Sequence, residues 1–161
     1  MQRSVAHTHW ARSIDHLIPK PSKETFGETE MRQTTRDIGN VLLRWHREFC
    51  RPTASRAREQ RRELNYGDIL GAVIGYDALC VRAGLPSEYA HACRNDLYAI
   101  SDWCSDRDFP PINALVVQTP QLQKGIAFPG SGYFEAMGTS QDWEEDVKQV
   151  ITFGDYPDEI L

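Results

Sequence analysis

Residues 68–83, DILGAVIGYDALCVRA, are apolar on nearly every side when they are drawn as a helix. One stripe at helical spacing consists of Ile69, Ala72, Val73, Tyr76 and Cys80. A helix without a polar face is normally buried, so this segment is predicted to lie at the centre of its domain. Glycine recurs every four residues along one edge, where we expect another helix to approach the backbone closely. These glycines are Gly67, Gly71 and Gly75.

Amphipathic patterns on both sides of this segment predict further helices. Apolar residues share one face from about residue 30 to residue 50, and Pro52 is expected to end that helix because proline has no backbone N–H. Residues 55–65 are predicted to form a basic helix with almost no apolar face. Two more amphipathic helices are expected at residues 87–104 and 140–153.

Two short apolar stretches favour strands. Residues 112–118, INALVVQ, are rich in β-branched residues, and residues 126–128 are expected to form a second extended piece. The prediction is an α+β domain over residues 29–161, mainly helical, with a small sheet of two or three strands toward the C-terminal half. Residues 1–28 keep no sustained period and are expected to form a partly ordered N-terminal arm.

Length and composition exclude several classes of protein. The chain has 161 residues, of which 40% are hydrophobic and 25% charged, as in an ordinary globular domain. No hydrophobic stretch approaches the roughly 20 residues that span a bilayer, and the N-terminus lacks the apolar region of a secretory signal. We therefore expect a cytoplasmic protein with no membrane partner and no cofactor, whose four cysteines stay reduced.

The formal net charge of -5 hides a polarity along the chain. Residues 1–64 carry thirteen Lys and Arg against eight Asp and Glu, or +5, whereas residues 65–161 carry five against fifteen, or -10. The candidate binding residues of the basic segment are Arg51, Arg56, Arg58, Arg61 and Arg62. Arginines in such a run can follow the phosphates of a nucleic acid, or they can pack against an acidic surface of this chain or of a second copy.

A glycine-rich turn, PGSGY at residues 129–133, is a second candidate for binding. Its backbone N–H groups could hold an anion, with Gly130, Ser131, Gly132 and Tyr133 as the binding residues. The turn lacks a P-loop lysine and does not match the dinucleotide fingerprint. The alternative is a simple chain reversal, with Tyr133 packing back on the sheet.

A cluster of acidic residues before the predicted strand is the candidate for a metal site. Asp102, Asp106 and Asp108 could hold a divalent cation near the glycine-rich turn, which would favour a hydrolase. Acidic residues in a turn between a helix and a strand are also commonly just solvated.

The C-terminal half carries a recognisable pattern, WC…PPxNxLVV…PGxGY. Its matching residues are Trp103-Cys104, Pro110-Pro111, Leu115-Val116-Val117 and Pro129-Gly130-x-Gly132-Tyr133. Over about residues 94–153 the chain resembles a family of small uncharacterised bacterial and phage proteins associated with mobile-element and defence genes. The resemblance implies no established activity.

Two functions are carried forward. The leading hypothesis is a non-enzymatic cytoplasmic binding or regulatory module that docks electrostatically on a protein or nucleoprotein partner, such as an inhibitor, an immunity factor or a defence-linked accessory protein. Self-association and nucleic-acid binding are both compatible with it. The alternative is a small metal-dependent hydrolase or nuclease that acts on nucleotides or nucleic acid.

Overall fold

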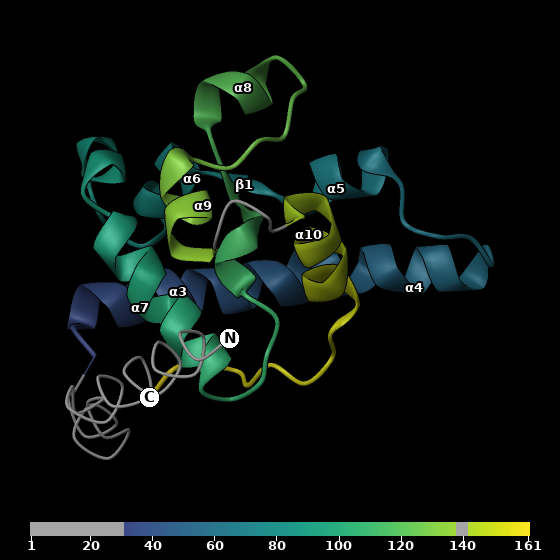
Figure 1. The fold of residues 1–161 in the computed structure, drawn as a ribbon, viewed down its shortest axis with the longest axis horizontal. Coiled ribbons are helices and arrows are strands. Elements are labelled where there is room, and N and C mark those ends of the chain that lie inside the picture. Colours follow the sequence, from purple (N-terminus) through teal and green to yellow (C-terminus); the bar gives the residue numbers. More distant parts are fainter. Residues whose placement is uncertain (1–30, 138–141) are drawn as a thin grey trace, which may run out of the picture. The chain divides into compact units, whose positions relative to one another are not determined.

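The computed structural model describes residues 31–137 and 142–161, and the arm expected at residues 1–28 lies outside them. The residues from Arg32 to Leu161 form one compact unit. This unit is mainly helical with a small two-stranded parallel sheet, which confirms the predicted α+β class (Figure 1). No helix in the described ranges combines the length and apolar character needed to cross a bilayer.

A long, nearly continuous helix runs through the unit. It consists of α3 (Gln33–Trp45), the π-helical turn η1 (His46–Cys50) and α4 (Arg51–Glu59), which lie along one line in Figure 1. The expectation that Pro52 ends the helix is therefore wrong. The π turn is wider than an α turn and gives the proline ring room, and the Thr53 hydroxyl donates to the Phe49 carbonyl at 2.7 Å.

The central apolar segment is not one helix. It folds as α5 (Tyr66–Ala72), β1 (Ile74–Gly75) and α6 (Tyr76–Arg82), with Val73 in an extended conformation between the first two. The parallel pairing of β1 with β2 (Val116–Val117) satisfies backbone groups that a helix would have satisfied internally. The prediction of a central position holds, because the stripe residues Ile69, Ala72, Val73 and Cys80 are buried.

The glycine edge of this segment is also corrected. A side chain at Gly71 would meet open space, so no helix packs closely there. Gly75 is crowded instead by Thr119, whose Oγ1 lies 2.7 Å from the position of an added Cβ. The spacing of four residues therefore reflects one close contact in the sheet region and not a helix–helix seam.

The C-terminal half adds short elements around the sheet. They are η2 (Ser87–His91), α7 (Arg94–Ser105), η3 (Ile112–Leu115), β2, α8 (Thr119–Gln123), α9 (Ser131–Met137) and α10 (Trp143–Thr152), with η2 and η3 being 3₁₀ turns. The strand predicted at 112–118 shrinks to two residues. Residues 126–128 form no strand, and only an isolated antiparallel bridge joins Val117 to Pro129.

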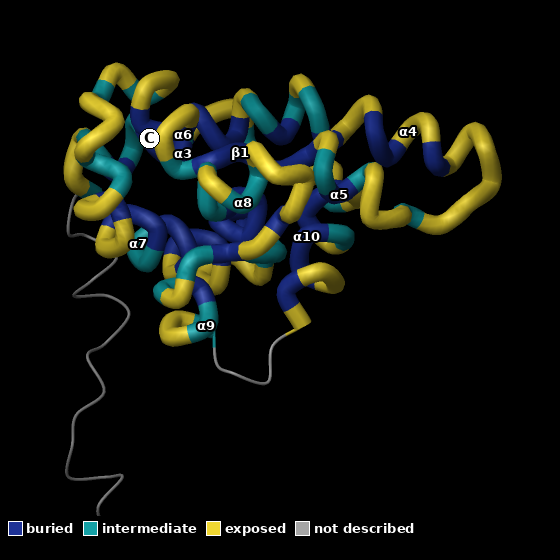
Figure 2. Tube along the Cα trace, turned by 90° about the horizontal axis from the view of Figure 1, so that it is seen from above, coloured by how far each residue is buried: buried dark blue, intermediate teal, exposed yellow. Residues whose placement is uncertain are grey.

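The core lies between α3 and the elements that surround it. Helix α3 contacts α6, α7 and η3, while α10 contacts η3, α4 and α5. The dark blue segments of Figure 2 run through these helices and both strands, where Leu42, Ile74, Leu115 and Val147 are almost completely buried. Burial of these side chains supplies the main stabilisation.

Four helices end in the same kind of turn. After α4, α6, α7 and α8, a backbone N–H bonds to the carbonyl five residues earlier, and the residue before that N–H has a left-handed backbone. Glycine takes the left-handed position after α6 (Gly84) and α8 (Gly125). Asp108 takes it after α7 and Arg61 after α4, with φ angles of 56° and 51°.

Candidate functional site

The predicted arginines lie on a hairpin formed by α4, the loop at residues 60–65 and α5, which we call the arginine hairpin. In Figures 1 and 2 helix α4 runs out past α10, and the chain turns back to α5 at the far end. The expectation of a helix with no apolar face needs correction, because Ala54 and Ala57 are buried and α4 contacts α10. The helix also ends earlier than expected, at Glu59.

Most of the arginines on this hairpin hold few partners. Arg62 makes a two-pronged ion pair with Asp68, at 2.6 and 3.1 Å, and this contact holds the pKa of Asp68 below its ordinary value. Arg51 and Arg56 make only long hydrogen bonds of 3.4 Å to Gly154 O and Thr53 Oγ1. Arg58 and Arg61 are exposed, and within the described residues neither side chain makes a hydrogen bond or an ion pair, although the Arg61 N–H donates to the Arg58 carbonyl at 3.1 Å.

The turn at the hairpin tip is unusual because Arg61 stands at a left-handed position. The Arg62 N–H bonds to the Ala57 carbonyl at 3.0 Å, as the Leu85 N–H bonds to the Cys80 carbonyl at 2.9 Å after α6. In that second turn the left-handed residue is Gly84, which adopts the conformation without steric cost. A residue with a Cβ pays on the order of 1 kcal/mol there.

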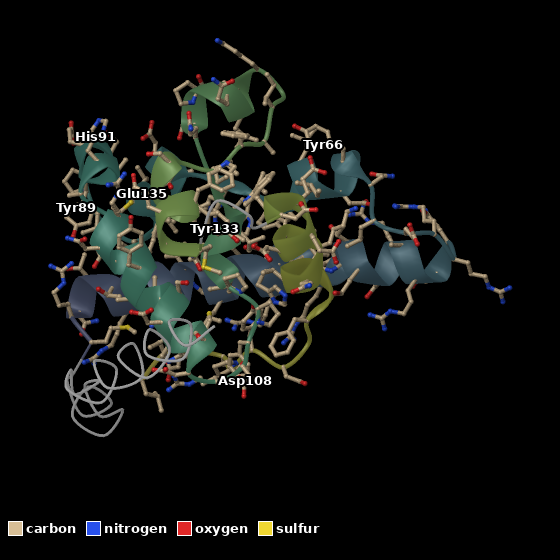
Figure 3. The ribbon with its side chains drawn as sticks, viewed as in Figure 1. Tyr66, Tyr89, His91, Asp108, Tyr133 and Glu135 are labelled. Atoms are coloured by element: carbon tan, nitrogen blue, oxygen red, sulfur yellow. The ribbon has the colours of Figure 1, made fainter. Side chains whose placement is uncertain are left out.

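A pocket of about 580 Å³ lies beside the glycine-rich turn. It opens where both parallel strands end: Tyr76 follows β1, and Gln118 follows β2. Its walls come from α6, η2, α7, η3, α8 and α9 (Figure 3). The predicted residues Gly130, Ser131, Gly132 and Tyr133 all line it.

The glycines of this turn serve close packing and not an anion-binding loop. A Cβ at Gly130 would lie 2.6 Å from the Tyr76 hydroxyl oxygen, and one at Gly132 would lie 2.8 Å from Arg94 Nε. Neither glycine has a left-handed backbone, so the alternating geometry of an anion nest is absent from residues 129–133. The Gly130 backbone is already hydrogen-bonded to Tyr76, whose pKa burial raises to about 12. The predicted residues therefore border a pocket whose polar contacts come from side chains.

Arg94 and Glu135 stand at the mouth of the pocket. Arg94 Nη1 lies 3.2 Å from Glu135 Oε2, and Arg94 Nη2 donates to Ser131 Oγ at 3.3 Å. The Tyr98 hydroxyl donates to the same Glu135 oxygen at 3.3 Å. Figure 3 shows Glu135 and Tyr133 on α9, with His91 on η2.

The inner wall includes a buried polar side chain. Asn113 is 4% exposed and lines the pocket, and its Oδ1 has no hydrogen-bond partner within the described residues. Tyr133 lies nearby in the wall, and its hydroxyl donates to the buried carboxylate of Asp146. Burial and this hydrogen bond raise the pKa of Tyr133 well above its ordinary value.

The candidate metal ligands do not come together. Asp102 is exposed on α7, Asp106 caps the end of that helix and Asp108 occupies the left-handed position after it. Within residues 31–137 and 142–161 no three His, Cys, Asp or Glu side chains form a group that could hold a metal ion. The three aspartates also do not line the pocket beside Gly130. Asp102 and Asp108 line a different pocket that Asp106 does not reach, so the short spacing in sequence does not bring all three carboxylates together.

The cysteines belong to the core. All four are buried and free, and burial raises the pKa of the Cys50 and Cys93 thiols to about 12 and that of Cys104 to about 11. A thiol with so high a pKa is a poor nucleophile.

The chain matches no family model, no curated protein and no solved structure. The resemblance of residues 94–153 to small bacterial and phage proteins therefore stays a prediction.

Sequence reasoning missed the side chains that give the pocket its chemistry, namely Tyr76, Arg94, Tyr98 and Asn113. Only Asn113 carried a usable signal, since it interrupts the apolar run INALVV. A polar residue in a buried run requires a partner, which is a reason to look for a site around it.

Proposed function

We propose that the protein is a non-enzymatic binding or regulatory module that docks electrostatically, through the arginine hairpin, on an acidic surface of a protein partner. The observation that carries the proposal is the pair Arg58 and Arg61, two exposed cations without partners among the described residues. They lie at the end of α4 and in the turn that follows it, the part of the hairpin that runs out past α10.

The hairpin is held firmly enough to present these side chains. Ala54 and Ala57 fix one side of α4, and Asn65 caps α5 through reciprocal hydrogen bonds with Asp68 of 3.0 and 2.8 Å. Arg62 ties the loop to the same Asp68. Because the frame is set by these contacts, little conformational entropy remains to be lost in its backbone on docking.

The left-handed backbone of Arg61 supports the same proposal. Glycine would relieve about 1 kcal/mol of strain at this position, yet the chain places an arginine there. The Arg61 side chain makes no hydrogen bond or ion pair within the described residues, so such interactions inside the unit do not explain its presence in the turn. Contact with an acidic partner gives the Arg61 side chain an electrostatic role.

A second copy of the chain is one such acidic partner. Helix α10 exposes Glu144 and Glu145 in its first turn, and the tail exposes Asp155, Asp158 and Glu159. Among the described residues, Arg62–Asp68 is the one ion pair that the five predicted arginines make, so their charge is largely left for contacts outside the unit. Self-association would then satisfy both charged surfaces.

The experiment compares Arg58→Glu combined with Arg61→Glu against the control Lys124→Glu. Lys124 is an exposed cation at the end of α8, away from the hairpin, so a single reversal there changes net charge without touching the docking surface. Mass would be measured by light scattering at low and high salt, and binding by titration with poly-L-glutamate and with a single-stranded oligonucleotide.

We expect the double variant to lose association with the second copy or with poly-L-glutamate by about tenfold or more, and the control to keep it. High salt should weaken the native interaction because exposed charges are screened. Unchanged association of the double variant with both would contradict the proposal. Tighter binding to the oligonucleotide than to poly-L-glutamate would contradict the choice of a protein partner and favour nucleic acid.

A further inference from the structure

The pocket lies at the edge of the parallel sheet where ligands commonly bind. Strands β1 and β2 run in the same direction, with Ile74 opposite Val116 and Gly75 opposite Val117, and the pocket-lining residues Tyr76 and Gln118 follow directly. The pocket therefore lies at the carboxyl ends of both strands, the edge at which larger open α/β sheets bind their ligands. The pocket volume of about 580 Å³ lies within the usual range of small-molecule sites.

Asn113 is an acceptor that needs a donor. Its side chain is buried, it lines the pocket and its Oδ1 accepts no hydrogen bond within the described residues. This oxygen is itself covered, so the carboxamide has to turn to present it to the pocket. An unpaired buried acceptor costs about 1–3 kcal/mol. A ligand that brings an N–H group to Oδ1 recovers that cost, and an amide side chain is the natural partner for the N–H edge of a base.

Arg94 at the mouth is available to an anion. Its ion pair with Glu135 joins two half-exposed side chains, 49% and 58% accessible, at 3.2 Å. Exposed pairs of this kind contribute at most about 1 kcal/mol, so a bound phosphate or carboxylate can replace Glu135. The guanidinium geometry favours planar contact with two oxygens of such a group.

Three tyrosines complete the walls. Tyr76, Tyr98 and Tyr133 all line the pocket, and each hydroxyl already has a partner, in the Gly130 backbone, Glu135 and Asp146. Their rings therefore offer aromatic surface more than free polar groups. Aromatic walls suit a planar ring, because a base packs on an aromatic side chain whatever its identity.

From these features we infer that the pocket binds a nucleoside monophosphate. The base lies among the tyrosines and donates an N–H to Asn113 Oδ1, and the phosphate takes the place of Glu135 at Arg94. None of the residues that hold the ligand belongs to the arginine hairpin, so this binding is independent of the proposed docking function.

Calorimetric titration of the full chain with AMP, CMP, GMP and UMP tests the inference, with the matching nucleosides and inorganic phosphate as partial ligands. At least one monophosphate should bind about tenfold or more tightly than its nucleoside and than phosphate alone. No binding by any of the four at millimolar concentration, or equal affinity for phosphate and monophosphates, would overturn the inference.

Variants assign the two ends of the ligand. Arg94→Gln should weaken monophosphate binding by about tenfold and leave nucleoside binding unchanged, while Glu135→Gln should tighten it because the competing carboxylate is gone. Asn113→Leu should weaken nucleoside and monophosphate alike. The matched control Arg58→Gln removes an arginine of the hairpin and should change neither.

Glu135 is exposed, so its variant keeps the test usable if Asn113→Leu fails to fold. Binding that is insensitive to both Arg94→Gln and Glu135→Gln would place the phosphate elsewhere and overturn the assignment. A loss that appears only with Arg58→Gln would do the same and would assign nucleotide binding to the hairpin.

Discussion

The arginine hairpin and the pocket use glycine in opposite ways. At the hairpin tip a residue with a large side chain, Arg61, adopts a backbone that glycine would adopt without strain. In the pocket wall Gly130 and Gly132 have ordinary backbones, but Tyr76 and Arg94 leave no room for a Cβ. The difference teaches that a glycine in this sequence marks a close contact as often as a turn, and that exposed left-handed turns accept charged residues, Arg61 and Asp108.

The largest effect is expected from Gly130→Ala. The added Cβ would press on the hydroxyl and ring of Tyr76, which are fixed by packing, so we expect a loss of about 2 kcal/mol in the free energy of unfolding. Gly71→Ala is the matched control, because open space surrounds that helical position and alanine favours helices by up to about 1 kcal/mol. Urea denaturation measures both free energies of unfolding. Equal effects of the two substitutions would contradict the claim that Tyr76 leaves no room for a Cβ at Gly130.

The root of the hairpin should be sensitive to acid. His46 in the π turn is fully buried, its Nε2–H donates to the Val150 carbonyl at 2.8 Å, and burial lowers the pKa of its imidazole. The unfolded chain therefore binds a proton at higher pH than the folded one, and stability falls as pH drops below the ordinary value of about 6.5.

The loss from this histidine should begin near pH 6.5 and can reach at most about 2 kcal/mol by pH 5, because one proton is worth about 1.4 kcal/mol per pH unit. Denaturation at several pH values measures the slope, and His46→Gln should flatten it while keeping a donor to Val150. His91→Gln, at an exposed position on η2, serves as the control. A slope that survives His46→Gln unchanged would show that the root of the hairpin is not the acid-sensitive part.

The hairpin tip can be compared directly with the end of α6 by exchanging residues. Arg61→Gly should raise the free energy of unfolding by about 0.5–1 kcal/mol, and Gly84→Arg should lower it by about 1 kcal/mol, because only glycine is unstrained at a left-handed position. Thermal unfolding measures both. If Arg61→Gly raises stability and also weakens association with an acidic partner, then stability and docking place opposite demands on this residue. If Arg61→Gly instead lowers the free energy of unfolding, the arginine side chain stabilises the folded state.

The smallest effect is expected at the ion pair that closes the hairpin. Arg62→Gln should lower the free energy of unfolding less than any of the substitutions above, since its contact with Asp68 is near the surface and is screened by salt. The loss should shrink as salt is added. If Arg62→Gln lowers the free energy of unfolding more than Gly130→Ala does, contacts in the hairpin contribute more to stability than the packing at the pocket wall.

The fold class followed from the sequence because helical periodicity is strong on both sides of the central segment. The break at Val73 did not, since residues 68–83 are buried whether they form a helix or a helix, strand and helix. Only pairing with Val116 and Val117, more than 40 positions away, selects the second arrangement. The continuation through Pro52 was hidden for a similar reason, because a π turn leaves no mark in the pattern of apolar residues.

For the two candidate sites, the residue types in the sequence indicated where the sites lie but not which side chains contact one another there. The run of arginines and the PGSGY turn were visible as residue types, and they lie on the hairpin and around the pocket. Whether Arg62 is paired and Arg58 is not depends on the path of the loop. The role of Gly130 depends on Tyr76, which is brought to it by the parallel pairing of β1 and β2.

The π turn at His46–Cys50 amounts to one residue more than an ordinary helix would contain. The wide turn absorbs that residue, so α3 and α4 keep the relative phase of an uninterrupted helix one residue shorter. Loss of a single codon within the turn would close it to an ordinary α turn and leave Ala54 and Ala57 facing α10. Loss of a codon within α4 before Ala54 would instead turn the rest of that helix by about 100° and bring charged neighbours against α10. The orientation of the arginine hairpin therefore depends on where along this helix the chain length changes.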